Sequence, residues 1–385
     1  MELVVTCLWS AAVAVLIHRA IAQRNLFEEV QPVDSDSDPP TARILVIVPA
    51  RNESLNISGC IEGLTRQTYP SGKHVVRIVD DHSNDDTAQI ARAAASPHAG
   101  FSVVASPPLP PRWVGKCHAC WVGATRDIDD PPEWLCFIDA DVVAEPELLA
   151  AALRHAEAQS LDLLSLAPKQ ILGTWTERLV LPCGLYCLSF CQDFERLRTD
   201  ECRDTSVMGQ FLLVRAEAYY AVGGHRAVSD AICEDLALAR QFKQHGRRIA
   251  LFGGRELLSS RMYRDWSSMK IGLAKNLVET FGGKLRTTWI AFGAVVLAWA
   301  AIAIPLLDAW GCARGAPLAC GALGLALASS GAAFGLHFAG ARFFAIPLWY
   351  GLLFPLGYSL GALIAVDSLF RHFRRRFEWK GRVYP

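Results

Sequence analysis

Three long stretches of the sequence contain no Asp, Glu, Lys or Arg. They run from Trp289 to Leu307, from Gly315 to Ala341 and from Phe343 to Val366. Each reaches roughly the 20 apolar residues that a helix needs to cross the hydrocarbon core of a membrane. A buried helix of a soluble protein rarely runs so far without a charge, so the pattern predicts transmembrane helices over residues 289–370.

A fourth apolar run lies at the start of the chain, from Leu3 to Ile17, and basic residues follow it at Arg19 and Arg24. A secretory signal peptide has a basic beginning, whereas this run is preceded by Glu2. We therefore favour an uncleaved membrane anchor over residues 1–24, with its basic end in the cytoplasm, over a signal peptide.

Between these apolar regions, short apolar runs alternate with segments of helical spacing. Ile44 to Val48 is a continuous run of β-branched residues and Leu, which is typical of a buried parallel strand, and Asn52 to Gln67 has a helical period. Further strands are predicted at Val75–Val79, Phe101–Val104 and Trp134–Ile138, with a helix at Thr87–Ala95. This order predicts an α/β fold, a doubly wound sheet over residues 43–260 that binds ligands at the carboxyl ends of its strands.

The remaining segments connect these parts or follow them. Residues 25–42 are expected to form a linker, in which Gln31–Pro40, rich in Asp, Ser and Pro, should stay unstructured. Residues 261–288 are expected to form an amphipathic interface segment. Residues 371–385 form a basic tail that we expect in the cytoplasm. Three full crossings after a cytoplasmic domain would place this tail outside, against the positive-inside rule. Because Pro347 and Pro355 interrupt the last apolar run, it is a candidate for a broken, re-entrant or interfacial segment, and the number of crossings stays open.

The charge balance narrows the class of protein. Lys plus Arg number 38 and Asp plus Glu also number 38, so no basic excess is available to neutralise the phosphates of a nucleic acid. Hydrophobic residues make up 52% of the chain, which excludes wholesale disorder. We expect no nucleic-acid partner.

The 12 cysteines do not form a recognisable disulfide or zinc pattern. The pair Cys117 and Cys120 has no second pair to complete a zinc site. Cys183, Cys187 and Cys191 recur every four residues on one helical face, where thiols could bind a metal, but we favour packing. Reduced thiols suit a cytoplasmic domain.

Polar clusters follow the predicted strands at Pro49–Glu53, Asp80–Thr87 and Asp139–Asp141. Two carboxylates one residue apart, as in the last cluster, suit Mg²⁺ or Mn²⁺, although this spacing is also common in solvated turns. No glycine-rich phosphate loop follows the first strand. A nucleotide would therefore be held by carboxylates, a metal and single basic residues, a combination that favours nucleotide-sugar chemistry.

With these clusters in this order, the sequence resembles the family 2 glycosyltransferases, which have the GT-A nucleotide-sugar-binding fold. Five elements occur in the family's order: Val46–Glu53, Gln67–Pro70, Val79–Thr87, Asp139–Asp141 and Glu234–Asp235. Three further segments are similar to the hopanoid-associated and carotenoid-type branch, which is related to ceramide glucosyltransferase: Pro110–Lys116, Gly209–Phe211 and Trp379–Arg382.

This resemblance implies a UDP-sugar donor, Mg²⁺ or Mn²⁺, and inversion at the anomeric carbon in a single displacement. It implies roles for the following residues: Asp81 at the uracil, the backbone of Pro49, Ala50 and Arg51 with Glu53 at the nucleotide, Asp139 and Asp141 at the diphosphate and its metal ion, Lys116 at the diphosphate or the sugar, and Asp235 as the catalytic base beside Glu234. Only one of the two adjacent acids can be the base. Without the family pattern, both would be interpreted as acids that complement a helix dipole.

The sequence departs from the family where many relatives carry Gln-x-x-Arg-Trp. Here Arg261-Met-Tyr-Arg264-Asp-Trp266 replaces the motif, which argues against processive polymer synthesis. Arg264 could pair with the pyrophosphate and Trp266 could form the floor of an acceptor site. Equally, the basic residues of this segment could contact lipid headgroups. Leu179–Phe190 could likewise admit a lipid or pack as a core helix, and His225 could contact substrate or belong to a turn.

These observations together predict an inverting, metal-dependent glycosyltransferase of the cell inner membrane with a cytoplasmic catalytic domain. It would move a sugar from a UDP-sugar to a membrane lipid, either a hopanoid or a related polyisoprenoid or sphingolipid-like lipid. Transfer to a polyprenyl phosphate and a non-catalytic membrane scaffold are the alternatives.

Overall fold

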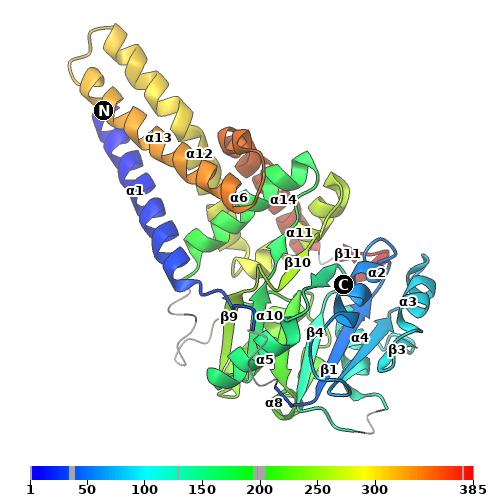
Figure 1. Cartoon of the computed structure of the whole chain (residues 1–385). Helices are drawn as coiled ribbons and strands as arrows, with labels where there is room; N and C mark the ends of the chain where they lie inside the picture. The colour runs from blue at the N-terminus through cyan, green and yellow to red at the C-terminus, as the bar shows by residue number, and fades with distance from the viewer. Residues whose placement is uncertain are drawn as a thin grey trace. The chain divides into compact units, whose positions relative to one another are not determined.

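The computed structural model describes residues 2–33, 40–127, 130–193, 197, 205–374 and 377–384. The chain divides into two compact units (Figure 1). The sheet unit comprises Phe27–Ile171 and Phe194–Met262. The helical unit comprises Met1–Leu26, Leu172–Asp193 and Tyr263–Pro385.

The larger sheet of the sheet unit has seven strands among the described residues, in the order β3-β2-β1-β4-β8-β6-β9. All neighbours are parallel except β8, which runs antiparallel to both β4 and β6. The strands are β1 (Ile44–Ala50), β2 (His74–Asp80), β3 (Phe101–Ala105), β4 (Trp134–Ile138), β6 (Leu163–Ala167), β8 (Phe211–Arg215) and β9 (Ile249–Gly253). The sheet confirms the predicted α/β class and all four predicted strands. A smaller sheet contains β5 (Val142–Ala144), β10 (Leu258–Ser260) and β7 (Lys169–Gln170).

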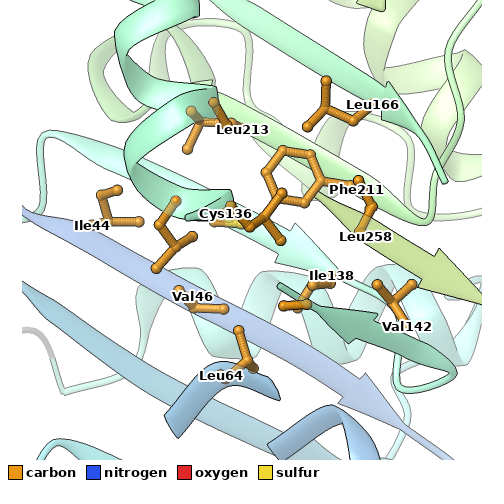
Figure 2. Packing of buried hydrophobic residues seen from close by; sticks show 14 of the residues in the cluster. Ile44, Val46, Leu64, Cys136, Ile138, Val142, Leu166, Phe211, Leu213 and Leu258 are labelled. Carbon is orange, nitrogen blue, oxygen red and sulfur yellow. The ribbon is translucent and has the colours of Figure 1, made fainter. Parts of the chain in front are cut away.

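Apolar residues cover both faces of the larger sheet, which explains the continuous apolar run of β1. Ile44, Val46 and Val48 belong to one buried cluster, while Leu45 and Ile47 belong to the other. Figure 2 shows part of the first cluster, where β1, β4 and β8 contribute neighbouring side chains. The helices of the unit are α2 (Ile57–Thr65), α3 (Thr87–Ala95), α4 (Gly115–Thr125), α5 (Leu148–Ala158), α8 (Ala216–Ala221), α9 (Gly224–Ala227) and α10 (Glu234–Gln244).

Helix α2 begins later than its predicted start at Asn52. Asn52 has a left-handed backbone with φ of 52°, which a helix cannot include, and the backbone N–H groups of Asn56 and Ile57 both donate to the carbonyl of Glu53. Residues 52–56 therefore form a loop at the end of β1, at the edge of the sheet where ligands are expected.

The helical unit contains α1 (Glu2–Leu26), α6 (Trp175–Cys191), α11 (Trp266–Thr280), α12 (Lys284–Ala313), α13 (Ala319–Phe343), the 3-10 helix η1 (Leu348–Leu353), α14 (Phe354–Arg374), β11 (Phe377–Trp379) and β12 (Arg382–Tyr384). Among the described residues, four segments are long and apolar enough to cross a membrane: Leu3–Arg24, Lys284–Ala313, Ala319–Phe343 and Leu348–Arg374. Of the basic tail expected at 371–385, residues 375, 376 and 385 lie outside the described residues.

Helix α6 joins the helical unit although it lies within the span 43–260 that the sequence pattern assigns to the sheet domain. Thr174 and Glu177 form a capping box at its start. Cys183, on its buried side, lies in an apolar cluster with Trp9 of α1 and Phe354 of α14. The apolar stretch Leu179–Phe190 is therefore part of a helix that packs in the helical unit.

The expected linker over residues 25–42 is partly ordered. Helix α1 continues to Leu26, and Val30 donates its backbone N–H to the carbonyl of Gly253 in β9. Residues 34–39, the centre of this linker, lie outside the described residues.

Candidate functional site

The loops after β1 and β2 are tied together by side chains. The Arg51 guanidinium donates from Nη1 to the carbonyls of Asp81 and His82, both at 2.6 Å. The backbone N–H of Asn52 donates to Ser83 Oγ at 3.0 Å. Because each loop supplies the partners of the other, the two strand ends form one rigid edge. The Arg51 side chain links the two loops through its two hydrogen bonds.

Asp81 lies at the centre of that edge. Its backbone N–H donates to the carbonyl of Ala50 at 2.8 Å, and its side chain is buried. Pro49 and Ala50 stand in register with the last residues of β2, Val79 and Asp80. The residues that the resemblance assigns to the nucleotide base are therefore assembled side by side.

A second cluster joins three elements around a lysine. Lys116 Nζ, in the first turn of α4, lies 2.7 Å from Asp139 Oδ1 and 2.7 Å from Glu234 Oε1. Asp139 follows β4, and Glu234 is the first residue of α10. Burial alone would lower the pKa of Lys116, but the two carboxylates hold this pKa well above its usual value. The ammonium therefore stays charged at neutral pH.

The two partners of Lys116 differ in access to solvent. The side chain of Glu234 is 7% exposed, and that of Asp139 is 25% exposed. Asp139 can therefore reach a ligand, whereas Glu234 lies mostly behind the lysine. Sequence analysis named Glu234 as a candidate catalytic residue beside the candidate base Asp235, and the structure provides it with a cationic partner.

Asp235 is held by backbone donors on both carboxylate oxygens. Oδ2 accepts from the N–H of Gly209 at 2.9 Å, and Oδ1 accepts from the N–H of Leu236 at 2.8 Å. A Cβ atom at Gly209 would lie 2.6 Å from Asp235 Oδ2, closer than real contacts allow. Gly209 thus lies against Asp235 without room for a side chain, a contact that sequence analysis did not foresee, although its Gly-Gln-Phe segment was noticed.

Carboxylates also gather at the end of β4. The residues from Asp139 to Val142 form a tight turn, closed by a hydrogen bond from the Val142 N–H to the Asp139 carbonyl. Burial raises the pKa of the nearby Cys60 thiol, and the charges of Asp141, Glu53 and Asp139 raise it further. These three carboxylates therefore surround the same region.

These residues fit a divalent ion that arrives with a phosphate ligand. In the described parts of the chain, no three His, Cys, Asp or Glu side chains are grouped so that they could hold a metal by themselves. Mg²⁺ commonly takes one or two carboxylates and completes its shell with phosphate oxygens and water. Asp139 and Asp141 provide such a pair.

Arg264 and Trp266 belong to the helical unit, whereas the other candidate residues belong to the sheet unit. Arg264 is exposed, and Trp266 is the first residue of α11. The helix is capped by Asp265, whose side chain accepts from the Ser268 N–H at 2.9 Å. The structure therefore gives the replaced motif a local role in starting α11.

His225 is buried, with 1% of its surface exposed. Its Nδ1 lies 2.9 Å from the hydroxyl of Tyr219, and its ring packs against Phe137. The residue is therefore part of the core beside a turn and offers no surface to a substrate. Burial lowers the pKa of His225 to about 4.

We expect this histidine to make the protein less stable in mild acid. The folded state binds the proton only near pH 4, whereas the unfolded chain binds it near 6.5, so protonation stabilises the unfolded state as the pH falls between these values. The loss amounts to about 2 kcal/mol between pH 7 and pH 5. Thermal unfolding of the purified protein at both pH values, compared with His225→Gln, measures it. An equal fall in melting temperature for both proteins would contradict this prediction.

Comparison with known proteins adds independent findings. Residues 39–270 match the protein family described as "Glycosyltransferase like family 2". The chain is 28% identical over 244 residues to the 4,4'-diaponeurosporenoate glycosyltransferase of Staphylococcus aureus, and the match covers 62% of each chain, so it spans less than two thirds of that relative. Among solved structures, the mannosyltransferase PcManGT from Pyrobaculum calidifontis, in complex with GDP-Man and Mn²⁺, is similar with a TM-score of 0.53 and 19% identity. That similarity covers 97% of this chain and 99% of the other, and at this identity it supports the fold alone.

Proposed function

Since this chain belongs to the glycosyltransferase-like family 2, we propose that it transfers a sugar from a UDP-sugar to a membrane lipid, with inversion at the anomeric carbon. The observation that carries the proposal is the convergence of Lys116, Asp139, Glu234 and Asp235 at the ends of β4, α4 and α10. A cation, a candidate metal ligand and a candidate base are the groups that this reaction needs.

The donor would lie along the carboxyl edge of β1, β2 and β4. Asp81 would accept a hydrogen bond from the N3–H of the uracil ring beside the backbone of Pro49, Ala50 and Arg51, and Glu53 would add a contact to the nucleotide. Asp139 and Asp141 would hold Mg²⁺ or Mn²⁺, which supplies positive charge to the diphosphate. The Pyrobaculum mannosyltransferase, which is similar in fold, is itself solved with GDP-Man and Mn²⁺.

Lys116 has the task of stabilising the charge that develops as the diphosphate leaves. Its ammonium remains charged, and Glu234 holds it from behind while Asp139 faces the ligand. A preorganised cation in a partly buried site stabilises a developing anion far more than one in water. Glu234 is therefore a positioning residue of this site.

Asp235 would accept the proton of the acceptor. The acceptor oxygen forms a bond to the anomeric carbon, the bond from that carbon to the diphosphate oxygen breaks, the proton moves to the Asp235 carboxylate, and UDP leaves. The two backbone hydrogen bonds fix the orientation of this carboxylate before the acceptor arrives. A base within hydrogen-bond reach typically contributes about 10²–10⁴-fold to the rate.

The acceptor is proposed from the helical unit and from the relative's name. Helices long and apolar enough to cross a membrane favour an acceptor dissolved in the bilayer. The Staphylococcus relative is named for glycosyl transfer to 4,4'-diaponeurosporenoate. We therefore favour a hopanoid or related polyisoprenoid in the cell inner membrane, with Arg264 and Trp266 near the acceptor and the sheet unit in the cytoplasm.

The proposal is tested by label transfer in membranes that contain the full chain. The membranes receive Mn²⁺ and one radiolabelled UDP-sugar at a time, with hopanoid or polyprenyl phosphate added, and lipids are then extracted. The proposal is supported if an acid-stable lipid becomes labelled and if this labelling is lost when a chelator is added or when Asp235→Asn replaces the parent chain. An acid-labile product would identify polyprenyl phosphate as the acceptor. If a folded, UDP-binding protein yields no labelled lipid with any acceptor, the chain is a scaffold.

Gly209→Ala is expected to lower kcat by about 10²-fold, because the new methyl group would displace the Asp235 carboxylate from its two donors. Binding of UDP should change little, since Gly209 does not lie at the ends of β1 and β2, where the uracil ring is proposed to bind. Initial rates and UDP affinity of the variant measure both quantities. Gly59→Ala provides a control for the loss of a glycine in the sheet unit, because an added Cβ there meets only Val143 Cγ2, at the ordinary contact distance of 3.7 Å. Unchanged activity in Gly209→Ala would contradict the assignment of Asp235.

A further inference from the structure

Helix α12 has the features of a complete membrane crossing. Trp289 and Trp310, both exposed, are separated by 21 residues, which span about 32 Å of helix. This length matches the hydrocarbon core of roughly 30 Å, and exposed Trp residues at both ends are typical of the two interfaces. The side that holds Lys284 and Arg286 is called the near side below, and the side that holds Arg314 is called the far side.

Two other helices run along the whole of α12. Thr6, near the start of α1, donates to Asp308 near the far end of α12 at 2.8 Å. At the other end of α1, Arg19 donates to the carbonyl of Gln192, next to the Cys191 carbonyl that accepts from Arg286. Helix α13 returns from the far side in contact with α12. These contacts describe three complete crossings among the described helices.

Helix α14 starts near the middle of α12 instead. Trp299, about 15 Å along α12 from the interfacial Trp289, donates from Nε1 to Ser359 Oγ in the second turn of α14, at 3.0 Å. At the other end, the Lys284 ammonium lies 4.5 Å above the Phe373 ring. The helix therefore runs from mid-depth to the near side. In Figure 1, α12 and α13 extend well past the start of α14.

The segment before α14 enters from the same near side. Helix α13 ends at Phe343, and η1 then turns back along it, so that Gly351 lies against Phe338. The His337 ring stacks on Phe354, the first residue of α14, with centroids 3.9 Å apart. Phe354 also contacts Phe334, with ring centroids 5.2 Å apart, so the segment reaches the level of Phe334 to His337, within about three turns of the end of α13.

We infer that residues 344–374 form a re-entrant hairpin, which enters the bilayer from the near side, reaches about half its depth and returns. The hairpin leaves three complete crossings among the described helices and places the C-terminal tail on the near side with α11. Its exposed apolar residues contact the acyl chains of the near leaflet only: Leu348, Trp349, Leu352, Leu356, Leu363, Val366 and Phe370.

The distribution of charge agrees with this arrangement. The near side then holds nearly all the described basic residues at the ends of these segments: Arg19, Arg24, Lys284, Arg286, Arg342, Arg371, Arg374, Lys380 and Arg382. Among the described residues at these ends, Arg314 alone lies on the far side. A fourth complete crossing would move the basic tail to the far side, against the positive-inside rule.

The disulfide bond provides an independent observation. A disulfide joins Cys312 in the last turn of α12 to Cys320 in the first turn of α13, at the far side, while the other cysteines in the described residues form no disulfide. Disulfides persist in oxidising compartments. The far side is therefore the oxidising side, and the tail lies on the opposite side of the membrane from the disulfide.

The test is thiol labelling in spheroplasts of bacteria that express the full chain with a cysteine added after Pro385. A membrane-impermeant maleimide should label this cysteine only after the membrane is permeabilised. After an impermeant phosphine reductant, the same maleimide should label Cys312 and Cys320 in intact spheroplasts, with the double variant Cys312→Ser and Cys320→Ser as the background. A C-terminal green fluorescent protein should fluoresce.

Labelling of the added cysteine in intact spheroplasts, with a dark fluorescent protein, would show a fourth crossing and overturn the inference. Failure to label Cys312 and Cys320 from outside would also overturn it, because α12 and α13 would then not cross. Neither result depends on sugar transfer, so the hairpin and the proposed function are tested separately.

Discussion

Asp235→Asn is expected to lower kcat for sugar transfer by about 10²–10⁴-fold while the KM for the UDP-sugar changes little. Asparagine preserves the size of the side chain and can still accept from the N–H of Gly209, so the fold of the site should persist. What it loses is the ability to take the proton of the acceptor hydroxyl. Steady-state rates with the identified sugar, together with UDP affinity, measure the two effects.

The alternative interpretation of Asp235 is an acid that complements the dipole of α10, and a matched variant separates the two. Glu217 also lies in the first turn of a helix of the sheet unit, α8, and is exposed. If the dipole alone matters, Glu217→Gln and Asp235→Asn should both cost only about 0.3–1 kcal/mol of stability and leave kcat unchanged. A full rate in Asp235→Asn would disprove its role as the base.

Lys116→Met is expected to lower kcat/KM by about 10²–10³-fold and also to destabilise the sheet unit. The substitution removes the cation that neutralises the leaving diphosphate, and it leaves the carboxylate of Glu234 buried without its partner. Removing one member of a fully buried pair costs about 3–5 kcal/mol, and the partial exposure of Lys116 should reduce this to roughly 1–3 kcal/mol. Initial rates and thermal unfolding of the purified protein measure the two losses.

A second substitution separates the structural loss from the catalytic one. In the double variant Lys116→Met and Glu234→Gln, the buried charge is gone, so most of the stability should return while the activity should not. Lys116→Arg tests whether the position of the positive charge matters, because a planar guanidinium cannot place a single point charge between the carboxylates of Asp139 and Glu234. If Lys116→Met retains its activity within threefold, Lys116 does not stabilise the leaving group.

The order of strands and helices in the sheet unit could be predicted from the sequence because its signals are local. The apolar run of β1 and the carboxylates after β2 and β4 lie within a few residues of each other. Parallel strands then bring their carboxyl ends to one edge, so Asp81 and Asp139 were predicted to share a site. The antiparallel strand β8 was not foreseen, because pairing between distant segments has no local signal.

The partners of the candidate residues could not be read from the sequence. Lys116 and Glu234 are separated by more than 100 residues, and Gly209 acquires its importance only because α10 brings Asp235 against it. His225 follows two glycines, a pattern that left substrate contact and a turn beside a helix as alternatives, and only the structure shows that the ring is buried against Tyr219 and Phe137. Burial depends on the whole packing arrangement, which no short window contains.

The sequence by itself determined the α/β class of the sheet unit, the apolar helices and the residue types at the strand ends, since hydrophobic period and length are sufficient for these. Only the tertiary structure decided that α6 joins the helical unit, that a glycine at 209 makes room for Asp235, and that α14 starts beside Trp299. The physical reason is that apolar length shows whether a helix can cross a membrane, whereas the depth at which it starts is set by side chains on other helices.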